Sequence, residues 1–260
     1  MTDFAKISRS KSIVSETIYI LLNILLAVTS TVLVVVTNSW IISCLFVVLS
    51  KWRIFAVRPR FWIANIKSNM IDFIVGVSFV FLIYLAGNDA LALRMVITVF
   101  YAIWLLVIKP RSSQLMVDIQ SGMALFLGTM TAVSLTFELP SAFLVVVCFV
   151  VGYSVARHIT LYEDDAEVGF TSIIFGIVLA ELAWISYHWL IAYDLPTTEL
   201  RVPQLSIIAT LFGFTTLAIY RSATNHEGKA KSSEVIMPII FSIIVTLILV
   251  IVFSEKAYNI

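Results

Sequence analysis

The residue with the most evident chemical use in this sequence is Glu181, which lies inside a long apolar run, in the segment AELAWISYHW. Trp184 and His188 follow it at spacings that place all three on one face of a helix. An ionisable group inside an apolar span is costly to keep there and is a candidate functional group for that reason. The pattern predicts a proton or cation site. A protonated Glu181 hydrogen-bonded to a neighbouring helix is the alternative.

A second acidic residue, Asp118, belongs to a stripe of polar and small residues at helical spacing. Small and hydroxyl residues allow helices to approach closely and to hydrogen-bond to one another. Two interpretations stay open: a packing face, or a vestibule lined by Asp118 that water reaches from the cytoplasm. The predicted intramembrane ion or proton site therefore consists of Glu181, Trp184, His188 and Asp118. The stripe contains Gln114, Asp118, Ser121, Gly122, Leu125, Thr129 and Ala132.

The segment KWRIFAVRPRFWIANIK, residues 51–67, mixes cations with aromatic side chains. This composition is typical of a stretch that lies on anionic lipid headgroups, and a simple topological anchor is the alternative. Asp72 follows closely and is expected to form a salt bridge with this segment. Nucleic-acid binding is a poor alternative because the segment is held at the bilayer. The predicted headgroup contacts are Lys51, Arg53, Arg58, Arg60 and Lys67.

Other sources of chemistry are not evident. The acidic residues from Glu163 to Glu167 lack the pattern of a calcium loop and are expected to favour the start of the next helix. The sequence contains no GxSxG, HExxH, Walker or CxxC motif. No span carries two histidines at haem spacing, and none carries a deep lysine for a retinal Schiff base. We therefore expect no cofactor and no metal, and a catalytic role is the less favoured possibility.

The elements that position these residues follow from the composition. Of the 260 residues 60% are apolar and 13% are charged, with a mean hydropathy of +1.02. Soluble domains are about 45–50% apolar and about 25% charged, so most of this chain is expected to lie in lipid. Cys44 and Cys148 lie inside apolar runs and are expected to be small buried residues without a disulfide. The composition predicts a single transmembrane domain over 1–260, with no soluble domain.

Nine apolar runs are long enough to be considered as spans. Backbone amides in lipid must be paired within the protein, and these runs are too long and too uniformly apolar for barrel strands, so each is predicted to be a helix. The second run is the weakest, because Lys51 and Arg53 lie near its end. A re-entrant first hairpin, giving eight spans, is the alternative. The runs are approximately 17–36, 39–57, 69–87, 91–108, 114–136, 140–158, 168–193, 203–220 and 235–254.

The basic residues are distributed unequally between alternate connections. If every run crosses, fourteen of the seventeen lysines and arginines lie on one side, and Arg94, Arg201 and Lys256 lie on the other. Cytoplasmic loops of membrane proteins carry such an excess of positive charge. The sequence thus predicts an all-α bundle of about nine spans with a cytoplasmic N-terminus, in the inner membrane of a bacterium.

Four segments carry a resemblance. KWRIFAVRPRFWIANI, KPRS, AELAWISYHW and VPQ together resemble segments of uncharacterised polytopic inner-membrane proteins of ultrasmall bacteria of the candidate phyla radiation. The resemblance implies a many-span membrane fold. It implies no activity and no site residues.

Three functional hypotheses follow. The leading one is a channel- or transporter-like protein that handles protons, ions or a small solute through Glu181. The second is a non-catalytic assembly or scaffold subunit with a membrane protein partner. The third is a lipid-processing enzyme, which requires further polar side chains at the cytoplasmic interface near Arg58 and Arg60. The bilayer and its anionic lipids are the expected partners in each case.

Overall fold

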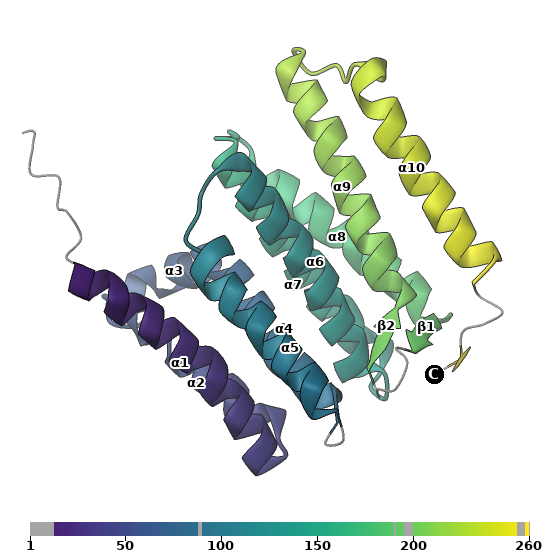
Figure 1. Cartoon of the computed structure of the whole chain (residues 1–260). Helices are drawn as coiled ribbons and strands as arrows, with labels where there is room; N and C mark the ends of the chain where they lie inside the picture. Colours follow the sequence, from purple (N-terminus) through teal and green to yellow (C-terminus); the bar gives the residue numbers. More distant parts are fainter. Residues whose placement is uncertain (1–12, 88–89, 190, 195–199, 254–257, 260) are drawn as a thin grey trace, which may run out of the picture.

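The structure is a computed structural model that describes residues 13–87, 90–189, 191–194, 200–253 and 258–259. Within these ranges it is an all-α bundle, as the sequence predicts (Figure 1). The helices of the first half are α1 (Ile13–Thr37), α2 (Trp40–Leu49), the 3₁₀ turns η1 (Trp52–Ile54) and η2 (Pro59–Phe61), α3 (Trp62–Ser68), α4 (Met70–Leu85), α5 (Leu91–Ile103) and the π-helical turn η3 (Trp104–Ile108). Those of the second half are α6 (Gln114–Thr136), α7 (Ser141–Tyr162), α8 (Val168–Tyr187), α9 (Gln204–Asn225) and α10 (Ser232–Ile251).

Seven helices among the described residues are long and apolar enough to cross a membrane, which is the character of a multi-pass membrane protein. An eighth span results if α3 and α4, which meet at a bend of 64°, count as one broken span. The weak second run is indeed short: α2 has 10 residues, about 15 Å of helix, which is half the thickness of the hydrocarbon core. The expected nine apolar runs therefore all contain helices, but two of these helices, α2 and α4, are not long enough to count as spans alone.

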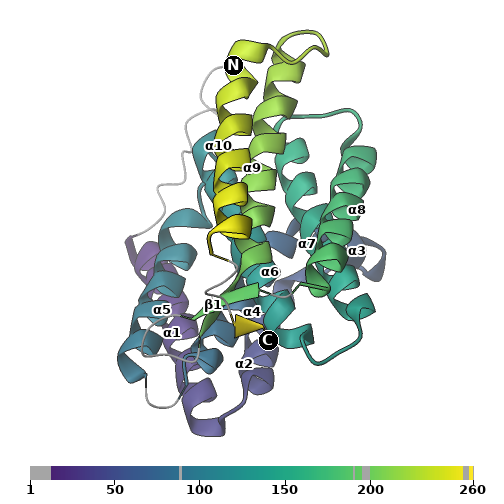
Figure 2. The same cartoon turned by 90° about the vertical axis from the view of Figure 1, so that its right-hand side faces the viewer.

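The helices run alternately up and down, and α6 lies at their centre (Figures 1 and 2). It packs against α4, α7 and α9. In its most apolar 18-residue segment, 67% is buried inside the protein. The corresponding value for α10 is 11%, because α10 packs mainly against α9 at one edge of the bundle. This difference explains the polar and small residues of α6, since its neighbours are helices and not lipid.

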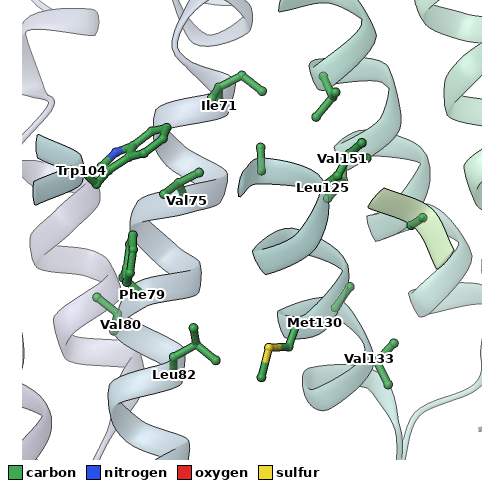
Figure 3. Packing of buried hydrophobic residues seen from close by; sticks show 14 of the residues in the cluster. Ile71, Val75, Phe79, Val80, Leu82, Trp104, Leu125, Met130, Val133 and Val151 are labelled. Carbon is green, nitrogen blue, oxygen red and sulfur yellow. The ribbon is translucent and has the colours of Figure 1, made fainter. Parts of the chain in front are cut away.

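A glycine in α6 allows the helices α4, α6 and α7 to pack closely together. A Cβ atom at Gly128 of α6 would lie 2.8 Å from Ile74 Cγ2 and 3.2 Å from the Val151 methyl groups, so only glycine permits this approach of three helices. Figure 3 shows buried apolar side chains around α4 and α6, with Trp104 on the side of α4 that faces away from α6. They include Ile71, Val75, Phe79 and Leu82 of α4, Trp104 of η3, Leu125, Met130 and Val133 of α6, and Val151 of α7.

The predicted seventh run, 168–193, is wrong at its end. Helix α8 stops at Tyr187, and the chain then forms strand β1 (Ile191–Asp194). Strand β1 pairs antiparallel with β2 (Arg201–Pro203) and β3 (Tyr258–Asn259), in the order β2-β1-β3. Arg201 Nε donates to Asp194 Oδ1 at 2.9 Å across the β1–β2 pair. Residues 191–193 therefore lengthen the apolar run in the sequence, but they belong to a strand and not to the helix.

The run 39–57 is also interrupted. The α-helix ends at Leu49, and the chain continues through Ser50 and Lys51 into η1. The turn between α1 and α2 contains Asn38 at a φ of 47°, in the left-handed region that asparagine tolerates. Across this hairpin the Ser43 hydroxyl donates to the Ser30 carbonyl at 2.9 Å. The tight hairpin returns the chain to the end from which α1 started (Figure 1).

Candidate functional sites

Asp118 is paired with an arginine from a distant part of the chain. Arg221 near the C-terminal end of α9 donates to both Asp118 carboxylate oxygens, with Nη1–Oδ2 at 2.7 Å and Nη2–Oδ1 at 2.8 Å. Its Nε also donates to Glu163 Oε1 at 2.9 Å. A planar guanidinium suits this two-pronged contact and carries its charge at any ordinary pH. These three residues, the Arg221 cluster, tie the end of α9 to α6 and to the residue that follows α7.

The neighbouring acidic residues organise the start of α8, as the sequence predicts. Asp165 Oδ1 accepts from the Glu167 backbone N–H at 2.8 Å, and Asp165 Oδ2 accepts from the Tyr220 hydroxyl at 3.0 Å. The backbone N–H is the main reason that the pKa of Asp165 lies below its ordinary value, with the Tyr220 hydroxyl also contributing. The carboxylate therefore joins the 163–167 turn to the adjacent end of α9.

This arrangement predicts a pH-dependent contribution to stability. Because the folded pKa of Asp165 is lowered, its contribution is present at neutral pH and is lost as the pH falls through the ordinary Asp value of about 3.9 and then through the folded value. Asp165→Ala should therefore lower the melting temperature at pH 7, and the difference from the parent chain should shrink at pH 3. Melting curves at the two pH values measure this. A deficit of equal size at both would contradict it.

A cavity of about 730 Å³ lies between α6, α7, α8 and α9, beside the Arg221 cluster. We call it the α6–α9 cavity. Its walls are apolar and partly aromatic, and Phe175 stacks on Phe212 with ring centroids 5.5 Å apart. The charged and phenolic groups that line it are Asp118, Glu167, Tyr220 and Arg221. Its size and its few polar groups are typical of small-molecule sites.

One polar group on the wall of this cavity has no partner among the described residues. Ser121 of α6 is 3% exposed, lines the cavity, and its hydroxyl makes no hydrogen bond in the part of the chain that the structure describes. An unpaired buried hydroxyl is unfavourable by about 1–3 kcal/mol. Ser121 is therefore available to hydrogen-bond to a molecule in the cavity.

The cavity reaches from the centre of the bundle to its apolar outer surface. Its inner wall contains the buried residues Leu125 and Val155. Its outer wall contains Phe170 and Ile174 of α8 and Phe214 of α9, which are 64%, 45% and 54% exposed. Since these exposed side chains belong to helices of membrane-crossing length, an apolar molecule could enter from the lipid between α8 and α9.

The structure does not bring Glu181 and Asp118 together. Glu181 is exposed and lines a separate groove on the outside of the bundle, between α7 and α8, with Val145, Phe149 and Ala180. Trp184 lines the same groove and contacts His188, with ring centroids 4.9 Å apart. The predicted grouping of Glu181, Trp184 and His188 on one face agrees with this placement. Their predicted role in handling protons or ions stays a prediction.

The basic segment contributes to a second ionic cluster. Lys51 forms an ion pair with Asp72, as expected, and Lys109 approaches the same Asp72 oxygen at 2.7 Å. Arg58 and Arg60 are exposed, and Lys67 Nζ lies 5.8 Å from the centre of the Tyr153 ring. The side chain of Arg53 lies outside the described residues. The polar side chains of Ser50, Asn65 and Asn69 line a pocket together with Lys51, Asp72 and Lys109. The lipid-processing hypothesis, which requires polar side chains near Arg58 and Arg60, stays a prediction.

Three residues of these sites were not identified from the sequence: Arg221, Ser121 as a ligand contact, and Lys109. The sequence did contain a signal for Arg221. Asp118 lies one turn inside its span, and a buried carboxylate there needs a cation at the same depth. Arg221 directly follows the run 203–220, which is predicted to end on the same side of the membrane. Nothing in the spacing of Lys109 distinguishes it from an ordinary loop cation. Among the described residues, no three His, Cys, Asp or Glu side chains are grouped so that they could hold a metal ion.

Comparison of the whole chain with protein-family models, with curated proteins and with solved structures finds no match.

Proposed function

We propose that the protein is a membrane transporter for apolar cations, with the α6–α9 cavity as its substrate site. The observation that carries this proposal is the combination of apolar, aromatic walls with an excess of negative charge at one end. Asp118, Glu163 and Glu167 bring three carboxylates to that end, and Arg221 neutralises one of these charges. A cation inside an apolar cavity gains from carboxylates and from aromatic faces together.

The charged groups at the Arg221 end of the α6–α9 cavity also argue against an anionic substrate. Arg221 already donates to two carboxylates, so its guanidinium has little capacity left for a third anion. A protonated amine can instead be bound by Glu167, and Ser121 can accept from it deeper in the cavity. The proposal places the cation-rich end of the bundle at the cytoplasmic face of a bacterial inner membrane. The unequal distribution of Lys and Arg in the sequence supports that orientation.

Binding of two rigid ions of opposite charge tests the cavity. Tetraphenylphosphonium and tetraphenylborate have the same shape, and we expect the full chain in lipid nanodiscs to bind the cation at least about tenfold more tightly, a difference of about 1.4 kcal/mol. Equilibrium dialysis measures both affinities. The binding of each ion to protein-free nanodiscs is subtracted, because the bilayer dipole potential makes the two ions partition unequally into lipid. Equal affinities after this subtraction would contradict the proposal.

A charge-matched pair of variants locates the binding. Glu167→Gln removes a carboxylate that lines the cavity, and Asp164→Asn removes an exposed carboxylate three residues away that does not line it. We expect Glu167→Gln to weaken tetraphenylphosphonium binding about fivefold, because it removes about 1 kcal/mol of attraction. Asp164→Asn should leave the affinity within about twofold of the parent value. Equal effects would indicate a diffuse surface field and not a site.

Glu181 enters this proposal as a candidate proton site for coupled transport, with Trp184 and His188 lining its outer path. This role is supported by the position of the Glu181 carboxyl group, which is exposed in the outer groove between α7 and α8, two helices of membrane-crossing length. The test is flux of tetraphenylphosphonium into proteoliposomes under an imposed pH gradient. Glu181→Gln should abolish the response to the gradient while leaving cation binding unchanged. An unchanged response would remove Glu181 from the mechanism.

A further inference from the structure

A second cavity lies where the basic segment meets the bundle. It has a volume of about 460 Å³ and is lined by Ser50, Lys51, Ile54, Asn65, Asn69, Asp72 and Lys109. We call it the Lys51 pocket. It forms at the 64° bend between the segment Pro59–Ser68 and α4, so α3 runs across the ends of the helices and not along them (Figure 1). The bend turns Asn65, Asn69 and Asp72 toward one space.

The Lys51 pocket holds two ammonium groups and one carboxylate. Lys51 and Lys109 both bond to Asp72 Oδ2, and the Lys51 and Asp72 side chains are only 9% and 12% exposed. Each ammonium has three donors, and Asp72 Oδ2 accepts one from each. The cluster therefore retains a net positive charge and spare donors in an open pocket, where the Lys109 side chain is 34% exposed.

The local backbone is built to bring the second ammonium into the pocket. Helix α5 ends in the π-helical turn η3, in which the Lys109 N–H donates to the Trp104 carbonyl at 2.9 Å. Trp104 is 1% exposed, and its indole N–H points to Asp72 Oδ1 at 3.5 Å. A π-turn is less stable than an α-helical turn and often occurs at functional sites. Here it presents Trp104 and Lys109 to the same carboxylate.

The electrostatics indicate that the pocket lacks negative charge. Burial lowers the pKa of Lys51 below its ordinary value, although the Asp72 carboxylate acts in the opposite direction. Repulsion by the Lys109 ammonium lowers the pKa of Lys51 as well, so one carboxylate does not offset burial and the second cation together. A bound anion would supply the missing stabilisation. The amides of Asn65 and Asn69 line the same space, and exposed Arg58 and Arg60 lie on the same segment.

We propose that the Lys51 pocket binds a phosphate group. A phosphate offers several strong acceptor oxygens to the two ammoniums, and its negative charge offsets the excess positive charge of the cluster. Its source is the headgroup of an anionic phospholipid or a soluble phosphate ester. The exposed aromatic residues Trp52 and Trp62 beside the pocket are of the kind that lies at a membrane surface.

Native mass spectrometry of the full chain in detergent tests the proposal and distinguishes the two sources. We expect phosphatidylglycerol to be retained in preference to phosphatidylcholine if the source is a lipid. Glycerol 3-phosphate should then fail to displace it. Displacement by submillimolar glycerol 3-phosphate would assign the same pocket to a soluble phosphate ester. Equal retention of the two lipids with no binding of glycerol 3-phosphate would overturn the proposal.

Three variants then separate a binding site from a structural ion cluster. Lys109→Gln should weaken phosphate binding about fivefold, and Arg111→Gln, an equal loss of charge at an exposed residue nearby, should change it less than twofold. Asp72→Asn should strengthen binding about fivefold, because it raises the positive charge of the pocket. If Asp72→Asn does not fold, the first pair decides. Equal effects of Lys109→Gln and Arg111→Gln, or weaker binding in a folded Asp72→Asn, would overturn the proposal.

Discussion

Replacing Arg221 with glutamine is expected to lower the free energy of unfolding by about 2–3 kcal/mol. The substitution leaves Asp118 and Glu163 without their shared cation, and like charges then face each other near the apolar walls of the α6–α9 cavity. The side chains of the three residues are 21–28% exposed, which places the effect between that of a surface pair and that of a fully buried one. Reversible unfolding in mixed micelles of increasing SDS fraction measures the change.

A rescue experiment shows whether charge is the cause. In a background that carries Asp118→Asn and Glu163→Gln, no carboxylate is left to be stranded, so Arg221→Gln should cost less than about 1 kcal/mol. Coupling of this kind is expected only for residues that interact directly. An equally large loss in both backgrounds would mean that Arg221 acts through the packing of its aliphatic stem.

The second large effect is expected at the contact between α7 and α8. A Cβ atom at Gly176 would lie 3.0 Å from the Phe149 ring and 3.1 Å from the Phe149 carbonyl oxygen, and the backbone cannot yield cheaply. Gly152 of α7 faces the same crossing, where its Cβ would lie 3.1 Å from Gly176 Cα. Gly176→Leu should therefore destabilise the protein by about 2–3 kcal/mol by forcing the two helices apart.

The matched control lies two turns earlier on the same helix. A Cβ atom at Gly169 meets no atom within 4 Å, so Gly169→Leu makes the identical substitution in open space. It should leave the stability unchanged or raise it by up to about 1 kcal/mol, because leucine is the better helix former. Unfolding in SDS micelles compares the two variants. Similar stabilities would contradict the close approach of α7 and α8.

Much of the fold could be predicted because lipid leaves the backbone few options. Each of the nine apolar runs contains a helix, since unpaired amides are excluded from hydrocarbon. The ends of the runs were harder to predict, because hydropathy does not distinguish a helix from a short apolar strand. Residues 191–193 are apolar, and yet they pair with β2 and β3. The same limitation applies to 50–57, where mostly apolar residues and two cations form one short 3₁₀ turn and irregular chain.

The sites were predictable only in part. The ion pair between Lys51 and Asp72 could be expected, because the two residues lie only 21 positions apart. Asp118 could be selected as an ionisable residue near the end of a span, but its partner comes from a distant helix that periodicity does not connect. Arg221 lies 103 residues from Asp118. The exposure of Glu181 could not be predicted either, because α8 is apolar on all sides and its sequence does not show which face meets α7. The cavity itself depends on the tertiary packing of four helices.

Protection of a cysteine inside the α6–α9 cavity tests the account most directly. In a chain whose natural Cys44 and Cys148 are replaced by alanine, Thr216→Cys places a thiol on the cavity wall, and Ile219→Cys places one on the exposed face of the same helix. With tetraphenylphosphonium bound, labelling by a membrane-permeant maleimide should slow at least about fivefold at residue 216 and remain unchanged at residue 219. Equal labelling rates at residue 216 with and without the cation would contradict the assignment of this cavity as the substrate site.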